Sequence, residues 1–128
     1  DAHVVSDNTG FGTRAADVLI CEDGDPLEAI INYYFEEKPA ATRQMGTQVE
    51  RMYRLLDLVK QYKADGVVAS RLYMCDLWAF EHFLMRKRLH ENNVPFLELE
   101  VDYTPEGQGQ IKTRVQAFVE SLADRQTA

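Results

Sequence analysis

The feature that most constrains the fold is an alternation of short apolar segments with longer amphipathic ones. Three short segments predict strands, at residues 2–6, 67–69 and 95–101. Four longer segments repeat apolar residues every three or four positions and predict helices, at residues 26–35, 48–62, 76–90 and from Gly109 onward. This order is typical of a parallel sheet with helices on both faces. We therefore predict an α/β fold, a Rossmann- or flavodoxin-like three-layer sandwich, in one domain spanning residues 1–128.

Two of the predicted helices begin with capping signals. Asp25 followed by Pro26 is typical of an N-cap and a first helical residue, and Thr47 with Glu50 three residues later is typical of a capping box. The apolar residues of the helix over 76–90 predict its core contacts, at Trp78, Phe80, Phe83, Leu84 and Leu89.

The charge balance and the cysteines exclude several classes of protein. With 14 basic and 21 acidic residues the formal net charge is −7, which argues against nucleic acid or an anionic membrane as a partner. No apolar run has the roughly 20 residues of a membrane span. Two widely separated cysteines do not form the disulfide framework of a secreted domain, so we expect a reducing, cytoplasmic location.

Polar residues follow each predicted strand. In open parallel sheets, ligands bind beyond the carboxyl ends of the strands. The loops after the three strands begin near Asp7, Arg71 and Asp102, and we expect all three to share one edge of the sheet. The alternative is that these loops are the ordinary polar surface of this fold class.

Cys75 is the most informative residue of these loops. It lies at the predicted start of a helix, where the partial positive charge of the helix end stabilises a thiolate, the form that ligates metals. Asp76 is the predicted N-cap of that helix. The alternative is a buried structural cysteine. Cys21 ends an apolar run and is predicted to be a core thiol.

The segment from Gly107 to Arg114 is a second candidate. Its two glycines allow close backbone approach, the amides of Gln108 and Gln110 can bond to exposed backbone, and Arg114 could pair with a carboxylate or a phosphate. The alternative is an ordinary helix start with surface charge. The three histidines, His3, His82 and His90, are predicted to be structural or solvated. Glu98 and Glu100 are predicted to be surface charge.

Four of these motifs together resemble the C-terminal half of the 2-hydroxyacyl-CoA dehydratase and benzoyl-CoA reductase subunits, the family of the 2-hydroxyglutaryl-CoA dehydratase D-component. The motifs are Asp65–Val68, Tyr73–Asp76, Asn93–Tyr103 and Gly107–Phe118. The segments Asp7–Arg14 and Asp25–Ala29 are also similar to the family. The pair Asp102-Tyr103 is slightly closer to the benzoyl-CoA reductase-like members, and Leu77 follows Cys75-Asp76 where many dehydratase subunits have proline.

The resemblance implies an enzyme of anaerobic metabolism. Family subunits pair with a homologous second subunit and hold an iron–sulfur cluster, typically [4Fe–4S], through three cysteines, the third of which matches Cys75. An ATP-hydrolysing iron–sulfur activator supplies a low-potential electron, which reaches an acyl-CoA thioester and drives radical dehydration or ring reduction. The resemblance implies substrate-binding or site-shaping roles for Asp7, Gly12, Arg14, Asp76, Gln108, Gln110 and Arg114.

The chain does not contain the other two cysteines of that pattern. We therefore expect it to be the C-terminal half of a longer iron–sulfur subunit, and we expect the isolated chain to bind no cluster and to be inactive. The alternative is a non-catalytic, flavodoxin-like interaction or assembly domain in which Cys75 is structural.

Overall fold

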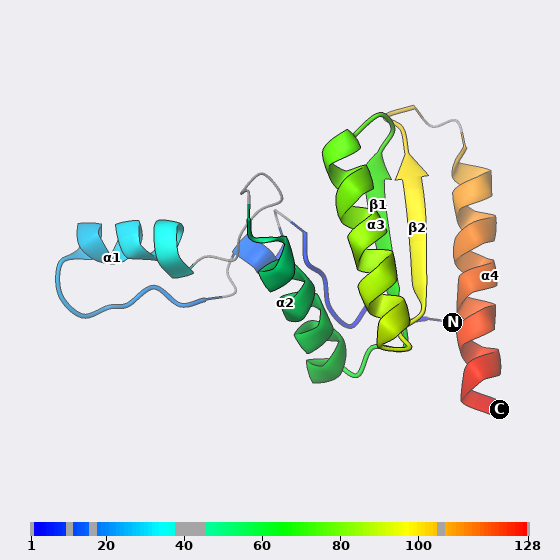
Figure 1. Ribbon diagram of the computed structural model, residues 1–128, viewed down its shortest axis with the longest axis horizontal. Helices are drawn as coiled ribbons and strands as arrows, with labels where there is room; N and C mark the ends of the chain where they lie inside the picture. The colour runs from blue at the N-terminus through cyan, green and yellow to red at the C-terminus, as the bar shows by residue number, and fades with distance from the viewer. Residues whose placement is uncertain (1, 10–11, 16–17, 38–45, 105–106, 128) are drawn as a thin grey trace.

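The computed structural model describes residues 2–9, 12–15, 18–37, 46–104 and 107–127, and Figure 1 shows their arrangement. The helical elements are η1 (Thr13–Ala15), α1 (Pro26–Asn32), η2 (Tyr33–Glu37, a π-helical turn), α2 (Gln48–Gln61), α3 (Asp76–Glu91) and α4 (Gln108–Thr127). The strands are β1 (Val67–Leu72) and β2 (Phe96–Val101). All four predicted helices and the second and third predicted strands are confirmed, with ends shifted by a few residues.

The two strands pair in parallel and form the middle layer of the fold. Val67 lies opposite Phe96 and Leu72 opposite Val101. Helix α3 packs on one face of this sheet and α4 on the other, as Figure 1 shows. A Cβ atom on Gly66 would lie 2.8 Å from Cζ of Phe118, so α4 comes close to the backbone just before β1. The predicted layered α/β fold with a parallel sheet is confirmed.

The predicted strand over residues 2–6 is wrong. In the described part of the chain the sheet has two strands, and residues 2–6 lie outside it. Val4 is 91% exposed, so the apolar side chains that suggested a buried strand are not covered. An apolar run becomes a strand only when a neighbouring strand takes up its backbone hydrogen bonds, and a sequence pattern does not show that neighbour.

The core lies between α2, α3 and the amino-terminal half of the sheet. Its buried members are Met52, Leu55, Leu56, Met85 and Leu89, with Val67, Ala69, Trp78, Val94 and Phe96 packed against them. Leu89 is fully buried as predicted, whereas Phe80 and Phe83 are exposed. The stripe of α3 that faces inward contains Glu81 and His82 as well as Met85 and Leu89, so apolarity identified Trp78 and Leu89 correctly but missed the buried polar residues.

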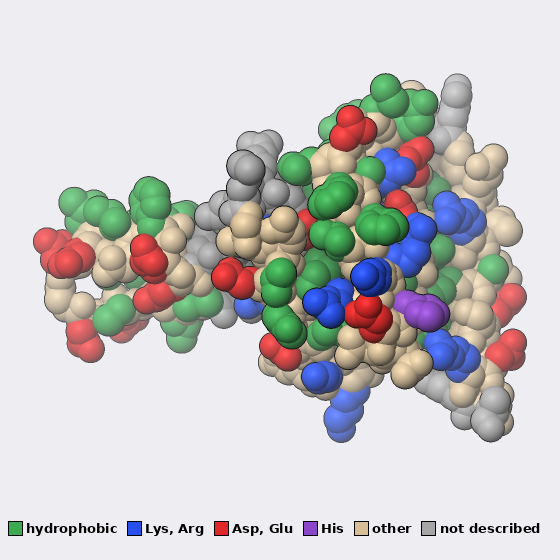
Figure 2. Space-filling model, in the orientation of Figure 1, with side chains coloured by type: hydrophobic (Ala, Val, Ile, Leu, Met, Phe, Trp, Pro, Cys, Tyr) green, Lys and Arg blue, Asp and Glu red, His purple; other side chains and the backbone are tan. Residues whose placement is uncertain are grey.

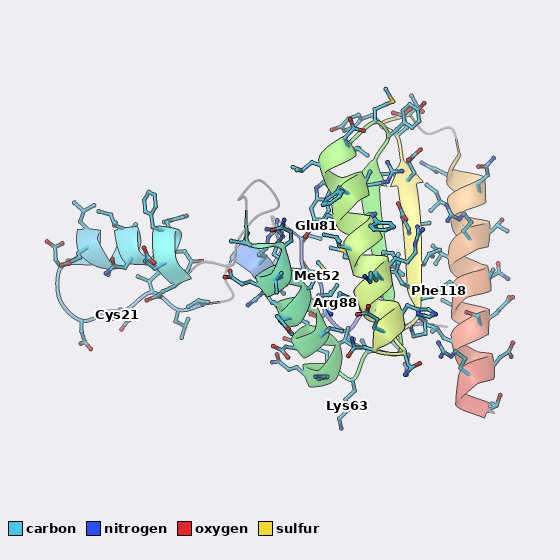
Figure 3. The ribbon with its side chains drawn as sticks, in the orientation of Figure 1. Cys21, Met52, Lys63, Glu81, Arg88 and Phe118 are labelled. Atoms are coloured by element: carbon cyan, nitrogen blue, oxygen red, sulfur yellow. The ribbon has the colours of Figure 1, made fainter. Side chains whose placement is uncertain are left out.

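Helices α2 and α3 are joined by a buried ion pair. Arg51 donates from Nε to Oε1 of Glu81 at 2.7 Å and from Nη2 to Oε2 at 3.0 Å, and Figure 3 shows Glu81 between the two helices. Thr47 accepts a hydrogen bond from Arg51 and makes no side-chain capping bond, so the predicted capping box is wrong. The two hydrogen bonds from Arg51 offset part of the desolvation free energy that burial of the Glu81 carboxylate costs.

Helix α1 lies apart from the sandwich (Figure 1). Its start is as predicted, since Asp25 Oδ1 accepts a hydrogen bond from Leu27 N at 2.8 Å and Pro26 is the first helical residue. Its apolar face is exposed, and the large side chains on that face are Leu27, Ile30, Ile31 and Tyr34. Cys21, labelled in Figure 3, lies in the same arm and is exposed, so the predicted core thiol is wrong.

Candidate functional site

The candidate site lies at the carboxyl ends of β1 and β2. Tyr73 N donates to Val101 O at 2.8 Å, which continues the sheet by one bond, and Cys75 N donates to Leu72 O at 3.1 Å, which closes a four-residue turn. The chain then enters α3, whose first hydrogen bond runs from Ala79 N to Cys75 O at 2.9 Å. The predicted position of Cys75, where a strand passes into a helix, is confirmed.

Cys75 itself is the N-cap of α3. Asp76 was predicted for that position, but it is the first residue of the helix and adds a negative charge to its first turn. The Cys75 side chain makes no capping hydrogen bond, is in no disulfide and is partly exposed. Cys75 therefore lies at the positive end of the helix dipole and is not fully buried.

Exposed apolar side chains surround this edge. We call Leu72, Tyr73, Met74, Leu77, Phe80 and Tyr103 the strand-end patch. Figure 2 shows hydrophobic side chains gathered over the upper end of α3, with a few red and blue side chains among them and more lower on the same face. Within the described ranges no group of three or more His, Cys, Asp or Glu side chains could hold a metal ion. Among the described residues at this edge, the thiol of Cys75 is therefore the one thiol that could ligate a metal.

A charged cluster lies between the sheet and α3, next to the core. We call Arg71, His82, Arg86, Glu98 and Glu100 the Glu98 cluster. Arg71 Nε donates to Glu98 Oε1 at 3.0 Å, Arg86 donates to Glu98 Oε2, and His82 Nδ1 lies 3.5 Å from Glu98 Oε1. Arg71 also pairs with Glu100, which lies opposite it in the sheet. The prediction of surface charge is therefore wrong for Glu98, which is partly buried, and is confirmed for Glu100, which is exposed.

The cluster shifts the titration of its members. Burial raises the pKa of Glu98, but the hydrogen bond from Arg71 and the charges of Arg86 and His82 outweigh burial, so that its pKa is below its usual value. Burial lowers the pKa of His82 more than the Glu98 charge raises it. The pKa of Arg71 is raised, first by the hydrogen bond to Glu98 and further by the charges of Glu100 and Cys75. Arg71 and Glu98 are thus charged.

Arg114 anchors α4 to β2. Its Nη2 donates to the backbone oxygen of Glu98 at 2.8 Å. Pro95 O and Val101 O accept from residues at the two ends of β1, so by alternation Glu98 O points away from β1, toward the outer edge of β2. Gln108 and Gln110 are exposed in the first turn of α4. Site-shaping roles for these three residues stay predictions.

The loop that contains Asp7 is organised around its own carboxylate. Asp7 Oδ1 accepts from Thr9 N at 3.0 Å, Thr9 Oγ1 at 2.8 Å and Thr13 N at 3.2 Å, and the backbone bond from Thr9 contributes most to lowering the pKa of Asp7. Position 12 requires glycine, because a Cβ atom on Gly12 would lie 2.0 Å from Asp7 Oδ1.

This loop does not join the other two. Figure 1 shows η1, which includes Arg14, well away from the ends of β1 and β2. The expectation that all three loops share one edge is wrong for the first loop, because residues 2–6 do not enter the sheet. Asp76 and Asp102 follow the paired ends of β1 and β2, as predicted. Whether Asp7, Gly12 and Arg14 contact a substrate stays a prediction.

Sequence reasoning missed Arg71, His82 and Glu98 as members of one cluster. A signal was present, because alternation along β2 places Glu98 and Glu100 on the same face as Phe96, and a helix covers that face. A charged residue on a covered face needs a partner, and Arg71, at the end of the neighbouring strand, is one arginine that could supply it.

Comparisons with known proteins identify the class. Residues 1–122 match the family described as 2-hydroxyglutaryl-CoA dehydratase, D-component. The chain is 30% identical over 112 residues to YjiM of Escherichia coli (strain K12), named as a candidate dehydratase subunit, with 87% of this chain and 28% of that protein covered. It is 24% identical over 123 residues to the (R)-phenyllactyl-CoA dehydratase beta subunit of Clostridium sporogenes, and 28% over 120 residues to the lactoyl-CoA dehydratase subunit beta of Anaerotignum propionicum.

The chain belongs to the 2-hydroxyglutaryl-CoA dehydratase D-component family, as its motifs indicated. The two beta subunits are matched over 93% of this chain and over 31% and 32% of their own lengths, so the chain spans about a third of these relatives. In the part of the chain that the structure describes, no helix has the length and apolar character needed to cross a membrane.

Proposed function

We propose that this chain forms part of an iron–sulfur subunit of a 2-hydroxyacyl-CoA dehydratase, in which the Cys75 thiolate is one ligand of the cluster. The observation that supports this most is the place of Cys75: it follows β1, is the N-cap of α3, is partly exposed and makes no side-chain capping bond. Membership in the family and relatives named as dehydratase beta subunits support the same function.

The residues at this edge fit a cluster as a partial ligand set. A cluster of this class is held by several cysteine thiolates, so the remaining ligands lie outside the described residues. When bound, the cluster supplies one-electron transfer at low potential to an acyl-CoA thioester. The N-terminus of α3 places partial positive charge at Cys75, and the strand-end patch keeps water from the sulfur once another surface covers it.

The partners follow from the same proposal. The relatives are named as beta subunits, so we propose a homologous second subunit, together with an ATP-hydrolysing iron–sulfur activator and an acyl-CoA substrate, in the cytoplasm. We propose dehydration of a 2-hydroxyacyl-CoA as the reaction, since the relatives are named for it. Ring reduction of benzoyl-CoA rests on Asp102-Tyr103 alone and is tested by assaying the complete complex with both substrates.

Exchange of each cysteine tests the cluster ligand. In the full-length subunit, purified without oxygen together with its partner, we expect Cys75→Ala to lose most of its bound iron and its visible absorbance. Cys21→Ala is the matched control, because Cys21 is exposed on the arm that carries α1, and this variant should retain both.

Equal iron in Cys75→Ala and in the unchanged protein would overturn the proposal. That result would favour an interaction or assembly domain in which Cys75 is structural. Stoichiometric iron in the isolated chain of 128 residues would show that the other ligands are misassigned.

A further inference from the structure

The arm that carries α1 presents an apolar and acidic surface away from the sandwich. The large apolar side chains of α1 and η2 are exposed, namely Leu27, Ile30, Ile31, Tyr34 and Phe35. Residues 18–37, which form this arm, contain six acidic residues and no basic one, and Figure 2 shows green and red side chains on it. Exposed apolar surface on this scale is typical of an interaction site, and the charge requires a partner surface that is basic as well as apolar.

A groove between α2 and α3 supplies apolar surface. It has a volume of about 260 Å³, and α2 lines it with Val49, Met52, Tyr53 and Leu56. Val49 is 54% exposed and Tyr53 is 60% exposed, so part of this lining is open to a partner. Sites for small molecules usually measure about 300 to 1,000 Å³, so the groove suits a few side chains of a protein better than a small ligand.

The helix ends beside the groove are basic. Residues 54–63, at and just after the end of α2, and residues 85–92, at the end of α3, together contain six basic and two acidic residues. Their net charge of +4 is opposite in sign to the −6 of residues 18–37. Figure 2 shows blue side chains over this part of the molecule, and Figure 3 shows Lys63 and Arg88 there. The groove therefore has the basic and apolar character that the arm requires.

Two side chains bring positive charge to the groove itself. Lys60 and Arg88 line it, and its other polar residues are Asp57 and Asn92. Arg88 pairs with Glu91 at 3.2 Å, whereas Lys60 pairs with no carboxylate in the described part of the chain. Because Lys60 is also exposed, its ammonium group is available to a carboxylate of the arm.

We propose that the arm carrying α1 docks in the α2–α3 groove of a second copy of this chain. Within one copy α1 lies apart from the groove, as Figure 1 shows, so the arm that fills a groove comes from another copy. Opposite net charges bring the two surfaces together, and the apolar side of α1 enters the groove as an amphipathic helix enters a hydrophobic cleft. Each copy has an arm and a groove, so two copies exchange arms and close a dimer with two-fold symmetry.

The number of copies of this chain per assembly tests the proposal. Light scattering of the full-length subunit with its partner should count two copies in the unchanged protein. Ile31→Glu on the arm and Tyr53→Glu in the groove each place a carboxylate in both contacts and should reduce the number to one. Val4→Glu is the matched control, because Val4 is an exposed apolar residue outside the arm and the groove, and this variant should keep two copies. Circular dichroism checks that each variant is folded.

A mixture of the two disrupted variants tests the exchange itself. Ile31→Glu keeps an intact groove and Tyr53→Glu keeps an intact arm, so a mixed pair regains one of the two contacts. We expect assemblies that contain one copy of each variant to form, with weaker association than in the unchanged protein.

Three results would overturn the proposal: one copy per assembly in the unchanged protein, two copies retained in both variants, or no mixed pairs in the mixture. The first would mean that another part of the same subunit, or its partner, covers the arm. The contact joins two copies, so it leaves the unfolding of a single copy at low concentration unchanged. The inference does not require a cluster at Cys75, and the iron content of Cys75→Ala tests the proposed function separately.

Discussion

His82 shows how one buried side chain links the fold to pH. It is 0% exposed, its two ring nitrogens have no hydrogen-bond partner, and its ring packs edge-on against Trp78 and Phe96 at centroid distances of 5.7 and 6.1 Å. Burial disfavours the charged imidazolium and lowers the pKa of His82. The folded protein therefore holds a neutral histidine where an unfolded chain would bind a proton.

This arrangement predicts a loss of stability in mildly acidic solution. The unfolded state takes up a proton below the ordinary histidine pKa of about 6.5, and the folded state does not. The free energy of unfolding is therefore unaffected by His82 above about pH 6.5 and decreases as the pH falls below that value. Urea unfolding at a series of pH values measures this slope. His82→Gln should flatten it between about pH 5 and pH 6.5, whereas the control His90→Gln, at an exposed site of the same helix, should not.

Glu98 acts in a separate, lower pH range. Its pKa lies below the ordinary value of 4.5, so its stabilising contribution is present above that value and is lost as the pH falls below it.

An equal slope in His82→Gln and in the unchanged chain between about pH 5 and pH 6.5 would show that His82 is not the group responsible.

At the scale of elements, the turn from β1 to α3 has an unusual backbone. Met74, the third residue of the Leu72–Cys75 turn, has φ of +63°, a conformation that glycine or asparagine adopts at lower cost. Its side chain is 76% exposed, so packing does not explain the choice of methionine. The strain lies next to the candidate ligand, where the turn must direct Cys75 to the start of a helix.

We expect Met74→Gly to raise the free energy of unfolding by about 0.5 kcal/mol, because relief of the left-handed conformation exceeds the extra entropy of glycine in the unfolded chain. The matched control is Tyr73→Gly, at an exposed neighbour, which gains no relief and should lower the free energy of unfolding by about 0.5 to 1 kcal/mol. Thermal unfolding followed by circular dichroism compares the two variants. Equal destabilisation by both would show that Met74 is not strained.

The elements were predictable from the sequence to different degrees. Periodicity located α2, α3, α4 and both strands, because each has a covered face of its own. It failed for residues 2–6, and it did not show that the apolar face of α1 is exposed, because burial depends on neighbours distant in sequence. At the site, the strand-to-helix transition placed Cys75 correctly, but the pairing of Arg71 with Glu98 depends on strand register, which a single sequence does not show.

At the scale of the whole molecule, the space between the sheet and α3 has two halves. At the amino ends of the strands it is apolar, built around Leu89, and at the carboxyl ends it is charged, built around Glu98. The apolar half supplies most of the hydrophobic stabilisation, while the charged half lies under the candidate site. Helix α1 belongs to neither half, since in the described residues its main contacts are with η2.

Two substitutions of the same chemistry test this division. Leu89→Ala removes a fully buried side chain from the core and should lower the free energy of unfolding by about 2 to 5 kcal/mol. Leu27→Ala removes a side chain that is 66% exposed on α1 and should change it by less than about 0.5 kcal/mol. Urea unfolding followed by circular dichroism measures both. If Leu27→Ala proved as costly as Leu89→Ala, α1 would pack against the sandwich in solution, and the division of the molecule into a core and a separate arm would be wrong.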